Sequence, residues 1–320
     1  MKLLEIGQCC ASVPQVYADT LGVDNVVFQR HPYYPVARRD RLLDARLHLT
    51  SNRDLENRIW KFPAFFRLIR DYDTLHFHWR SMMPLYADTL LYGKKKVILH
   101  FHGDDIRNKG WKSEFTGPFD FIFYATPDLK PFVEKRAVWI PNPVKPEEYV
   151  GVQDKGEGGK IGITHITGDI RGKRTYKGTE IITKVLGEIQ EGDPRVSFQV
   201  LTKLPHRQIR DALRATDIFI DQLTGYGMYG VSAVEAMYMG KPVVGSARPH
   251  YYENLPLVSA LDEQTLKTEL LRLINDYQLR VKLGTEGRAY ALRHHHPEQV
   301  ARRFLAYIGE SGALGKATCS

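Results

Sequence analysis

DIFIDQLTGYGMYGVSAVEAMYMGKPVV, residues 217–244, is the stretch on which the fold of this chain depends. The apolar run at its start predicts a strand that ends at Asp221, and a glycine-rich loop follows. A helix is expected from about Val231 to Met239, because the Gly-Lys-Pro sequence after it stops a helix. Backbone N–H groups at the start of such a helix bind phosphate, and Glu235 inside it can accept hydrogen bonds from a ribose diol. The stretch therefore predicts a phosphate and sugar site, the alternative being that its glycines only turn the chain.

Short apolar runs and longer helical stretches alternate in both directions from this stretch. The alternation is typical of parallel strands joined by crossover helices, and it predicts an α/β fold. A Pro-rich turn at 141–146 and a Gly-rich stretch at 151–159 separate two halves that each repeat the pattern. Two such Rossmann-like halves predict a cleft where helix starts and strand ends converge on a ligand. The expected strands are Lys2–Ile6, Asn25–Gln29, Thr74–His78, Val97–His102, Phe121–Ala125, Ala137–Ile140, Lys160–His165, Val196–Leu201, Ile218–Asp221, Pro242–Gly245 and Leu257–Val258.

Composition excludes several classes of protein. The chain has 320 residues, of which 43% are hydrophobic and 26% charged, enough for one large domain or two ordinary ones. It contains no apolar run of the ~18 residues that a membrane span needs and no secretory signal, so we expect a cytoplasmic protein. Its cysteines, Cys9, Cys10 and Cys319, have the spacing of neither a disulfide framework nor a zinc site. The net charge of +8 comes from basic residues interspersed with acidic ones, so we expect no nucleic-acid partner.

A basic loop follows the first expected strand of the second half. Residues 165–180 read HITGDIRGKRTYKGTE and enter a helix near their end. Paired cations and helix-end amides can stabilise a diphosphate leaving group without a metal. Arg174 and Lys177 are the candidates for this role, and Lys173 and Arg171 are alternative choices. A solvated basic loop is the other interpretation.

The first half carries two His-x-His pairs at the ends of neighbouring expected strands. His76 and His78 form one pair, and His100 and His102 form the other. Alternate residues of a strand share one face, so each pair could offer two metal ligands. No further carboxylate or cysteine completes a zinc set in the sequence, and we expect no metal. For His76 and His100, the favoured interpretation is a buried imidazole hydrogen-bonded to the backbone.

Residues Gly230–Val244 resemble the signature of glycosyltransferase family 4, whose members are retaining enzymes of GT-B architecture. The signature is Gly-x4-Glu-Ala-Met-x2-Gly-x-Pro-Val-Val, and this chain matches it. The basic loop and the runs at 102–107, 125–129, 139–144 and 287–301 also resemble segments of that family. The resemblance covers nearly the whole chain and weakens from Arg30 to about Ile69. After the first strand, Gly-Gln-Cys-Cys-Ala-Ser-Val replaces the family's usual glycine pair.

The resemblance implies roles for particular residues. Arg174 and Lys177 would neutralise the leaving diphosphate, and His102 and Asp105 would contact the sugar or the acceptor. The family has two glutamates eight positions apart, and the first falls here on Gly227, which leaves open the group that meets the donor sugar. The implied donor-binding residues are Gly227, Tyr229, Gly230, Val231, Glu235, Asp221, Gln222 and Thr126.

The implied activity is retaining transfer of a hexose from a nucleoside-diphosphate sugar to the hydroxyl of a saccharide or lipid-linked acceptor. Such enzymes build polysaccharides or glycoconjugates, here without a metal or other cofactor. A nucleotide-sugar epimerase of the same architecture and a non-catalytic nucleotide-sugar-binding protein remain alternatives. The expected parts are an acceptor domain at 1–145, a donor domain at 146–295, a helix at 296–308 that crosses back, and a flexible tail at 309–320.

The weakly matching segment 38–70 is basic and rich in aromatic residues. One interpretation is an amphipathic helix that lies on an anionic membrane, near a lipid-linked acceptor. The favoured interpretation is a helix with Trp60 and Phe66 packed inward and its arginines in solvent.

Overall fold

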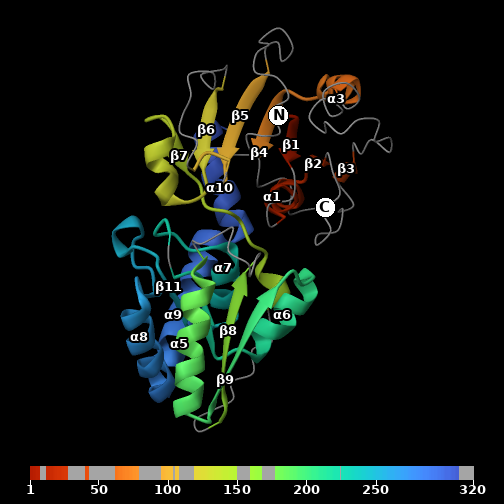
Figure 1. Ribbon diagram of the computed structural model, residues 1–320. Helices are drawn as coiled ribbons and strands as arrows, with labels where there is room; N and C mark the ends of the chain where they lie inside the picture. Colours follow the sequence, from red (N-terminus) through yellow and green to blue (C-terminus); the bar gives the residue numbers. More distant parts are fainter. Residues whose placement is uncertain are drawn as a thin grey trace, which may run out of the picture. The chain divides into compact units, whose positions relative to one another are not determined.

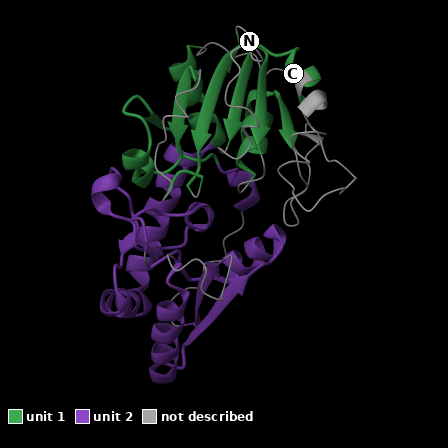
Figure 2. Ribbon diagram, turned by 45° about the horizontal axis from the view of Figure 1, so that its top comes forward, with its two compact units in different colours: residues 1–143, 297–320 green, residues 144–296 purple. Residues whose placement is uncertain are grey.

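The chain folds into two compact α/β units. The computed structural model describes residues 1–7, 12–27, 40–42, 62–78, 95–103, 105–107, 119–149, 159–167, 177–223 and 225–309. Unit 1 comprises residues 1–143 and 297–320, and unit 2 comprises residues 144–296 (Figure 2). The units therefore divide two residues before the boundary expected at 145, and the chain returns to unit 1 at Pro297. Among the described residues, no helix combines the length and the apolar character that a bilayer span requires.

The described part of unit 1 is built on a parallel sheet with the strand order β3-β2-β1-β4-β5-β6-β7 (Figure 1). Because the order reverses beside β1, the carboxyl ends of β1 and β4 flank the position where open α/β sheets bind ligands. The elements are β1 (Leu3–Gly7), α1 (Val13–Leu21), β2 (Asp24–Val27), β3 (Asp40–Leu42), α3 (Phe62–Ile69), β4 (Thr74–His78), β5 (Lys96–Phe101), β6 (Phe121–Tyr124), the 3-10 helix η4 (Pro127–Phe132), β7 (Val138–Trp139) and α10 (Pro297–Ile308).

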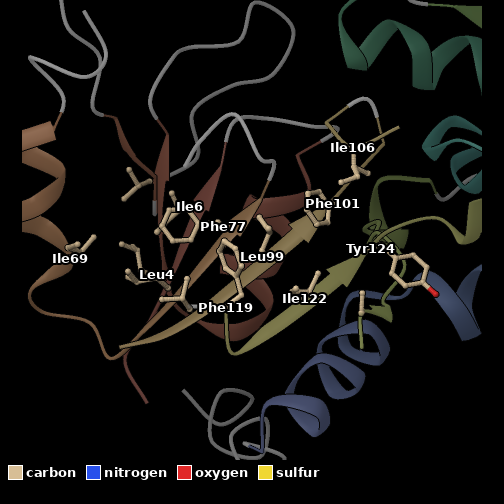
Figure 3. Close-up of a cluster of buried hydrophobic side chains, with 14 of the residues drawn as sticks. Leu4, Ile6, Ile69, Phe77, Leu99, Phe101, Ile106, Phe119, Ile122 and Tyr124 are labelled. Carbon is tan, nitrogen blue, oxygen red and sulfur yellow. The ribbon is translucent and has the colours of Figure 1, made fainter. Parts of the chain in front are cut away.

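Both faces of this sheet are covered, which explains why its central strands read as nearly continuous apolar runs. On one face, Phe77 and Leu99 pack in a cluster that includes Ile69 of α3 (Figure 3). On the other face, Tyr17 of α1 and Phe304 of α10 pack against a second cluster. The imidazoles of β4 and β5 lie on this second face, because Tyr17 contacts the rings of His76, His78 and His100.

Unit 2 contains, in its described residues, a parallel sheet with the order β12-β11-β10-β8-β9. The order reverses between β8 and β10, so the carboxyl ends of these two strands mark the ligand position of this unit. The elements are the 3-10 helix η5 (Pro146–Tyr149), β8 (Ile161–Thr167), α5 (Thr179–Gly192), β9 (Val196–Thr202), α6 (His206–Ala215), β10 (Ile218–Ile220), α7 (Val231–Tyr238), β11 (Val243–Gly245), the 3-10 helix η7 (Pro249–Tyr251), β12 (Val258–Ser259), α8 (Glu263–Asn275) and α9 (Tyr277–His295).

Helix α3 is the described helix that lies within the basic segment 38–70. Phe65 and Ile69 on this helix are buried in the core of unit 1, whereas Arg67 is exposed. The apolar side of the helix therefore faces the protein, and its arginine faces solvent. The two residues expected to point inward, Trp60 and Phe66, lie outside the described side chains.

Candidate functional site

The carboxyl ends of β8 and β10 bring together two residues expected to bind the donor. The strands are direct neighbours, with Ile220 of β10 beside His165 of β8. Asp221 immediately follows β10, and Lys177 lies in the loop that enters α5. Both residues therefore sit where the strand order reverses, although 44 positions separate them in the chain.

Asp221 connects the two loops through both of its carboxylate oxygens. Oδ1 lies 3.2 Å from Nζ of Lys177, and Oδ2 accepts a 2.7 Å hydrogen bond from the backbone N–H of Gly230. Gly230 is the N-cap of α7, and a Cβ atom there would lie 3.1 Å from Asp221 Oδ1 and 3.6 Å from Lys177 Nζ. The lysine, 18% exposed, is thus held beside the start of α7, where its charge and the helix dipole both favour an anion.

A buried histidine supports this arrangement from within the sheet. Nδ1 of His165 lies 3.0 Å from the carbonyl oxygen of Ile220, and Nε2 lies 3.0 Å from Oγ1 of Thr179. Burial lowers the pKa of His165 to about 4, so the ring is neutral at pH 7. Nδ1–H then donates to the carbonyl group and Nε2 accepts from the threonine, which ties β8, β10 and α5 together without adding charge.

Glu235 lies in the same helix α7, five positions after the N-cap. Its Oε1 accepts hydrogen bonds from the hydroxyl group of Tyr149 at 2.7 Å and from Nε2 of His206 at 2.8 Å. Glu235 is 4% exposed, and the hydrogen bond of its carboxylate to His206 raises the pKa of that imidazole. Two donors on other elements thus fix the orientation of the carboxylate that the sequence assigned to the ribose.

Sequence reasoning missed Tyr149 and His206. Tyr149 ends the 3-10 helix η5, and His206 is the first residue of α6. The available signal was positional, because His206 follows strand β9 at its carboxyl end, where ligand-binding groups gather in α/β sheets.

Gly227, which replaces a family glutamate, is required here by the backbone. Its φ is +75°, and a Cβ atom would lie 2.7 Å from Cγ of Arg248. The N–H of Arg248 also donates to the carbonyl oxygen of Gly227 at 2.9 Å. A glutamate at 227 does not fit this loop. The loop itself, and not only the side chain at 227, therefore differs from the family pattern.

Three other expected donor-binding residues have different surroundings. The hydroxyl group of Tyr229 lies 2.8 Å from Nε2 of His295, so the buried phenol is directed toward α9. Gln222 is also buried, and its side-chain amide donates to the carbonyl group of Met228. Val231 is the first residue of α7, where its backbone N–H belongs to the helix start. Arg174, the second expected phosphate ligand, lies outside the described residues.

In unit 1, Asp105 closes the loop that follows β5. Its Oδ1 accepts hydrogen bonds from the backbone N–H groups of His102 at 3.2 Å and Gly103 at 2.8 Å. Two residues later, Arg107 forms a buried ion pair with Asp128 at 2.8 Å. This pair connects the loop to the start of η4, which Thr126 precedes. The described carboxylate of Asp105 is therefore occupied by its own loop.

The two histidines of β4, His100 of β5 and His102, which follows β5, form one cluster with a carboxylate that the sequence did not suggest. Glu5 of β1 places Oε2 2.6 Å from Nε2 of His78 and 2.9 Å from Nδ1 of His76. His100 hydrogen-bonds the carbonyl group of Ile140 at 3.2 Å, as expected for a backbone-satisfied histidine, whereas His76 lies against Glu5.

The cluster has the composition of a metal site, but one of its three imidazoles is already hydrogen-bonded through both nitrogens. One potential donor atom from each of His76, His78 and His100 lies within 4.8 Å of the others. Both nitrogens of His78, however, are engaged, Nε2 with Glu5 and Nδ1 with His102 at 3.0 Å. We therefore assign no metal ligands to this cluster.

Solved structures of carbohydrate-active enzymes share the architecture just described. HepE of Anabaena, determined in complex with UDP and glucose, matches with a TM-score of 0.70 over 97% of this chain and 99% of that chain, at 12% identity. The chain has the GT-B fold. The sucrose-phosphate synthase of Thermosynechococcus elongatus matches with a TM-score of 0.67 over 96% and 98% of the two chains, at 14% identity. A putative UDP-N-acetylglucosamine 2-epimerase of Listeria monocytogenes matches with a TM-score of 0.60, over 96% of this chain and 95% of that chain, at 14% identity.

The expected two-domain GT-B architecture is therefore confirmed, while membership of family 4 stays a prediction. No family model matches the sequence, and no curated protein does.

Proposed function

We propose that this GT-B protein transfers a sugar from a nucleoside-diphosphate sugar to an acceptor hydroxyl. The observation that carries the proposal is the pair of groups on α7 in unit 2. Lys177 and the backbone N–H groups that follow Gly230 at the start of α7 offer an anion site, and Glu235 offers an oriented carboxylate five residues after Gly230. A nucleoside diphosphate needs both, because its phosphates are anionic and its ribose presents hydroxyl groups that donate hydrogen bonds.

In this proposal Lys177 stabilises the charge that develops on the leaving diphosphate. Asp221 holds the ammonium group in place, so its position costs little reorganisation during the reaction. Arg174 would supply the second cation, and no metal is then needed. Glu235 would receive the ribose hydroxyls through Oε2, since Oε1 is already bonded to Tyr149 and His206.

We further propose retention of configuration by a front-face path. In this path the leaving phosphate takes the proton of the acceptor hydroxyl, because the sequence offers no obvious nucleophile. The acceptor would be a saccharide or a lipid-linked sugar. His102, which follows β5 at the carboxyl edge of the unit 1 sheet, would contact the transferred sugar. Contact with an anionic membrane would involve the exposed arginine side of α3.

An epimerase is the second candidate, because one of the similar structures is a putative UDP-N-acetylglucosamine 2-epimerase. Epimerisation requires acid and base groups beside the sugar. The sequence offers three candidate carboxylates for that role, Asp104, Asp105 and Asp221. Of these, Asp105 and Asp221 are bonded to backbone N–H groups or to Lys177. The third, Asp104, lies outside the described residues. Transfer is therefore the better supported activity.

The test is a thermal-shift panel of UDP-, GDP-, ADP- and dTDP-sugars without added metal. A ligand at 100 times its dissociation constant stabilises the native protein by about 2.7 kcal/mol. We expect one nucleotide class to stabilise the protein, and Glu235→Gln to weaken this effect. The matched control is Glu188→Gln, an exposed glutamate of α5. If none of the four classes raises the melting temperature, the proposed function is wrong.

Turnover separates transfer from binding. Once a donor is known, release of its nucleoside diphosphate is measured for Lys177→Ala and for the control Lys184→Ala, an exposed lysine of α5. We expect Lys177→Ala to lower kcat by about 10²–10³-fold, as removal of an oxyanion donor does, and the control to behave like the native protein. An unchanged kcat in Lys177→Ala would remove this lysine from the mechanism.

A further inference from the structure

Glu5 is a carboxyl group in the centre of the unit 1 sheet, with 0% of its surface exposed. Its strand β1 pairs with β4, and Glu5 lies beside His76 in the register. In the described residues its contacts are to imidazoles, with His78 Nε2 at 2.6 Å and His76 Nδ1 at 2.9 Å. Burial raises the pKa of Glu5, since a carboxylate is poorly solvated there. A carboxyl group in such surroundings is costly as a structural feature alone.

The contacts continue from Glu5 to the edge of the sheet. Nδ1 of His78 lies 3.0 Å from Nε2 of His102, and Nδ1 of His102 lies 2.9 Å from Oδ1 of Asn142. Four side chains from β1, β4, and the segments after β5 and β7 thus form one unbroken chain of hydrogen bonds. The chain begins at a fully buried carboxyl group and reaches the residue proposed to contact the sugar.

The chain has one consistent set of protons in the resting protein. The amide oxygen of Asn142 only accepts, so Nδ1 of His102 carries a proton. Burial lowers the pKa of His102 and lowers that of His78 to about 3, so both rings are neutral and each carries a single N–H. Nε2 of His102 must then accept from Nδ1–H of His78. Nε2 of His78 is left as an acceptor, which requires that Glu5 is protonated and donates to it.

We propose that Glu5, His78 and His102 form a proton relay that turns His102 into an imidazolium when a sugar diphosphate binds near the carboxyl edge of this sheet. The inference rests on the proposed function, because the negative charge of the diphosphate is the trigger. The proton leaves Oε2 of Glu5 and bonds to Nε2 of His78, while the proton on Nδ1 of His78 moves to Nε2 of His102. Glu5 becomes a carboxylate, His78 stays neutral as its other tautomer, and the net charge of the chain is unchanged.

In the relay, the carboxylate of Glu5 and the imidazolium of His102 form only when a ligand is bound. In the resting protein every member is neutral, so no charge is buried without a partner. An anion bound at the carboxyl edge of the unit 1 sheet would offset the cost of separating charge, because the imidazolium then has a partner of opposite charge. Glu5 and His78 act through His102, and so they are positioning residues rather than catalytic ones.

The surroundings of the chain favour transfer along it. Tyr17 and His100 pack against the ring of His78, with ring centroids 5.4 and 5.6 Å away. His76 lies between Glu5 and Phe304, and its ring is 4.7 Å from that of Phe304. Further ionisable groups that face the chain, among the described residues, are the buried phenol of Tyr17, which interacts electrostatically with Glu5, and Asp105, which accepts from the backbone N–H of His102. The aromatic packing limits exchange of Glu5 with solvent, so His78 is its direct route for a proton.

The resting state can be tested without any donor. Carbon-13 NMR of the Glu5 carboxyl group and nitrogen-15 NMR of the histidine rings are recorded on ligand-free protein at pH 7. We expect a protonated Glu5 and neutral His78 and His102 with the proton on Nδ1. An ionised Glu5 in this sample would overturn the relay, whatever the protein binds.

The transfer step is tested by adding UDP-glucose to saturation. The expected changes are ionisation of Glu5, a doubly protonated His102 ring and movement of the His78 proton to Nε2. If UDP-glucose binds and His102 stays neutral, the relay is wrong while the proposed function stands. If the nucleotide-sugar panel shows no binding at all, the proposed function fails, and the transfer step fails with it.

A matched pair of variants links the relay to activity. Glu5→Gln keeps the size of the side chain and an N–H donor for His78, but it has no proton to give. Asp120→Asn makes the same chemical change near the opposite edge of the sheet, where Asp120 accepts from the backbone of Val97. We expect Glu5→Gln to abolish the imidazolium signal and lower kcat by about 10–100-fold with KM within twofold, and Asp120→Asn to change neither. Native kcat and an unchanged imidazolium in Glu5→Gln would contradict the proposal.

Discussion

His206 is a titratable partner of the carboxylate of Glu235. Its side chain is 25% exposed, its Nε2 lies 2.8 Å from Oε1 of Glu235, and this hydrogen bond is the main cause of its raised pKa. A group whose pKa is higher in the folded protein than in the unfolded chain stabilises the fold when it is protonated. That contribution is complete below the unfolded value of about 6.5 and is lost as the pH rises through the folded value.

His206→Gln should therefore destabilise the protein more in acid than in base. Urea unfolding at pH 5.5 and pH 9 measures the difference, which we expect to be about 1 kcal/mol larger at pH 5.5. His250→Gln, the loss of an exposed histidine in η7, is the control. Equal losses for His206→Gln at both pH values would show that the imidazole contributes through packing and not through its charge.

At the scale of single residues, the sequence predicted the groups that follow local patterns. Lys177 and Glu235 were found because each lies at a fixed offset from a glycine, and the structure gives each an ordered partner. Tyr149, His206 and Glu5 were missed because their contacts are to residues far away in the sequence. In the sequence, Glu5 is a single polar residue within an apolar strand. Its contacts depend on which strand lies beside β1, and the local sequence does not show this.

Among the elements of unit 2, α7 and α9 make a very close approach. A Cβ atom on Gly284 of α9 would lie 1.9 Å from the carbonyl oxygen of Gly240, which follows the C-terminal end of α7. The two helices can therefore lie together only because residue 284 has no side chain. Since α7 carries Gly230 and Glu235, its packing against α9 also determines where the proposed donor groups lie.

Gly284→Ala is expected to lower the free energy of unfolding by about 1–3 kcal/mol or more, the usual cost of overpacking. Gly187→Ala is the matched control, because Gly187 lies within helix α5 and a Cβ atom there meets nothing within 4 Å. Alanine has the higher helix propensity, so this control should gain about 0.5–1 kcal/mol. Opposite signs in chemical denaturation would confirm the contact, and a neutral Gly284→Ala would contradict it.

The central strands of the sheets could be predicted from the sequence better than the strands at the sheet edges. The apolar runs correctly placed the central strands, including β4 at Thr74–His78, because burial on both faces gives a strong signal. β3 (Asp40–Leu42) was not predicted, since this short edge strand reads Asp-Arg-Leu and carries little apolar character. Its identity as a strand comes from pairing with β2, which no local pattern records.

At the scale of the whole molecule, the chain builds unit 1 from both of its ends. It leaves unit 1 after Pro143, forms unit 2, and re-enters unit 1 at Pro297 with helix α10. Phe304 of this helix is fully buried among the side chains of unit 1, with its ring 5.4 Å from Tyr17 and 5.6 Å from Phe123. Unit 1 thus depends on residues that follow unit 2 in the chain.

Phe304→Ala should weaken unit 1 selectively. Removal of a buried phenylalanine costs about 3–5 kcal/mol, and here the cavity would open beside β4, β5 and β6 rather than in the unit nearest in sequence. Hydrogen exchange should show faster exchange of amides in β1, β4 and β5, with amides in β8 and β10 unchanged. Tyr307→Ala on the same helix is the control, because that side chain is 49% exposed. Equal acceleration in both sheets would mean that the units unfold as one, and unchanged exchange would mean that α10 adds little to unit 1.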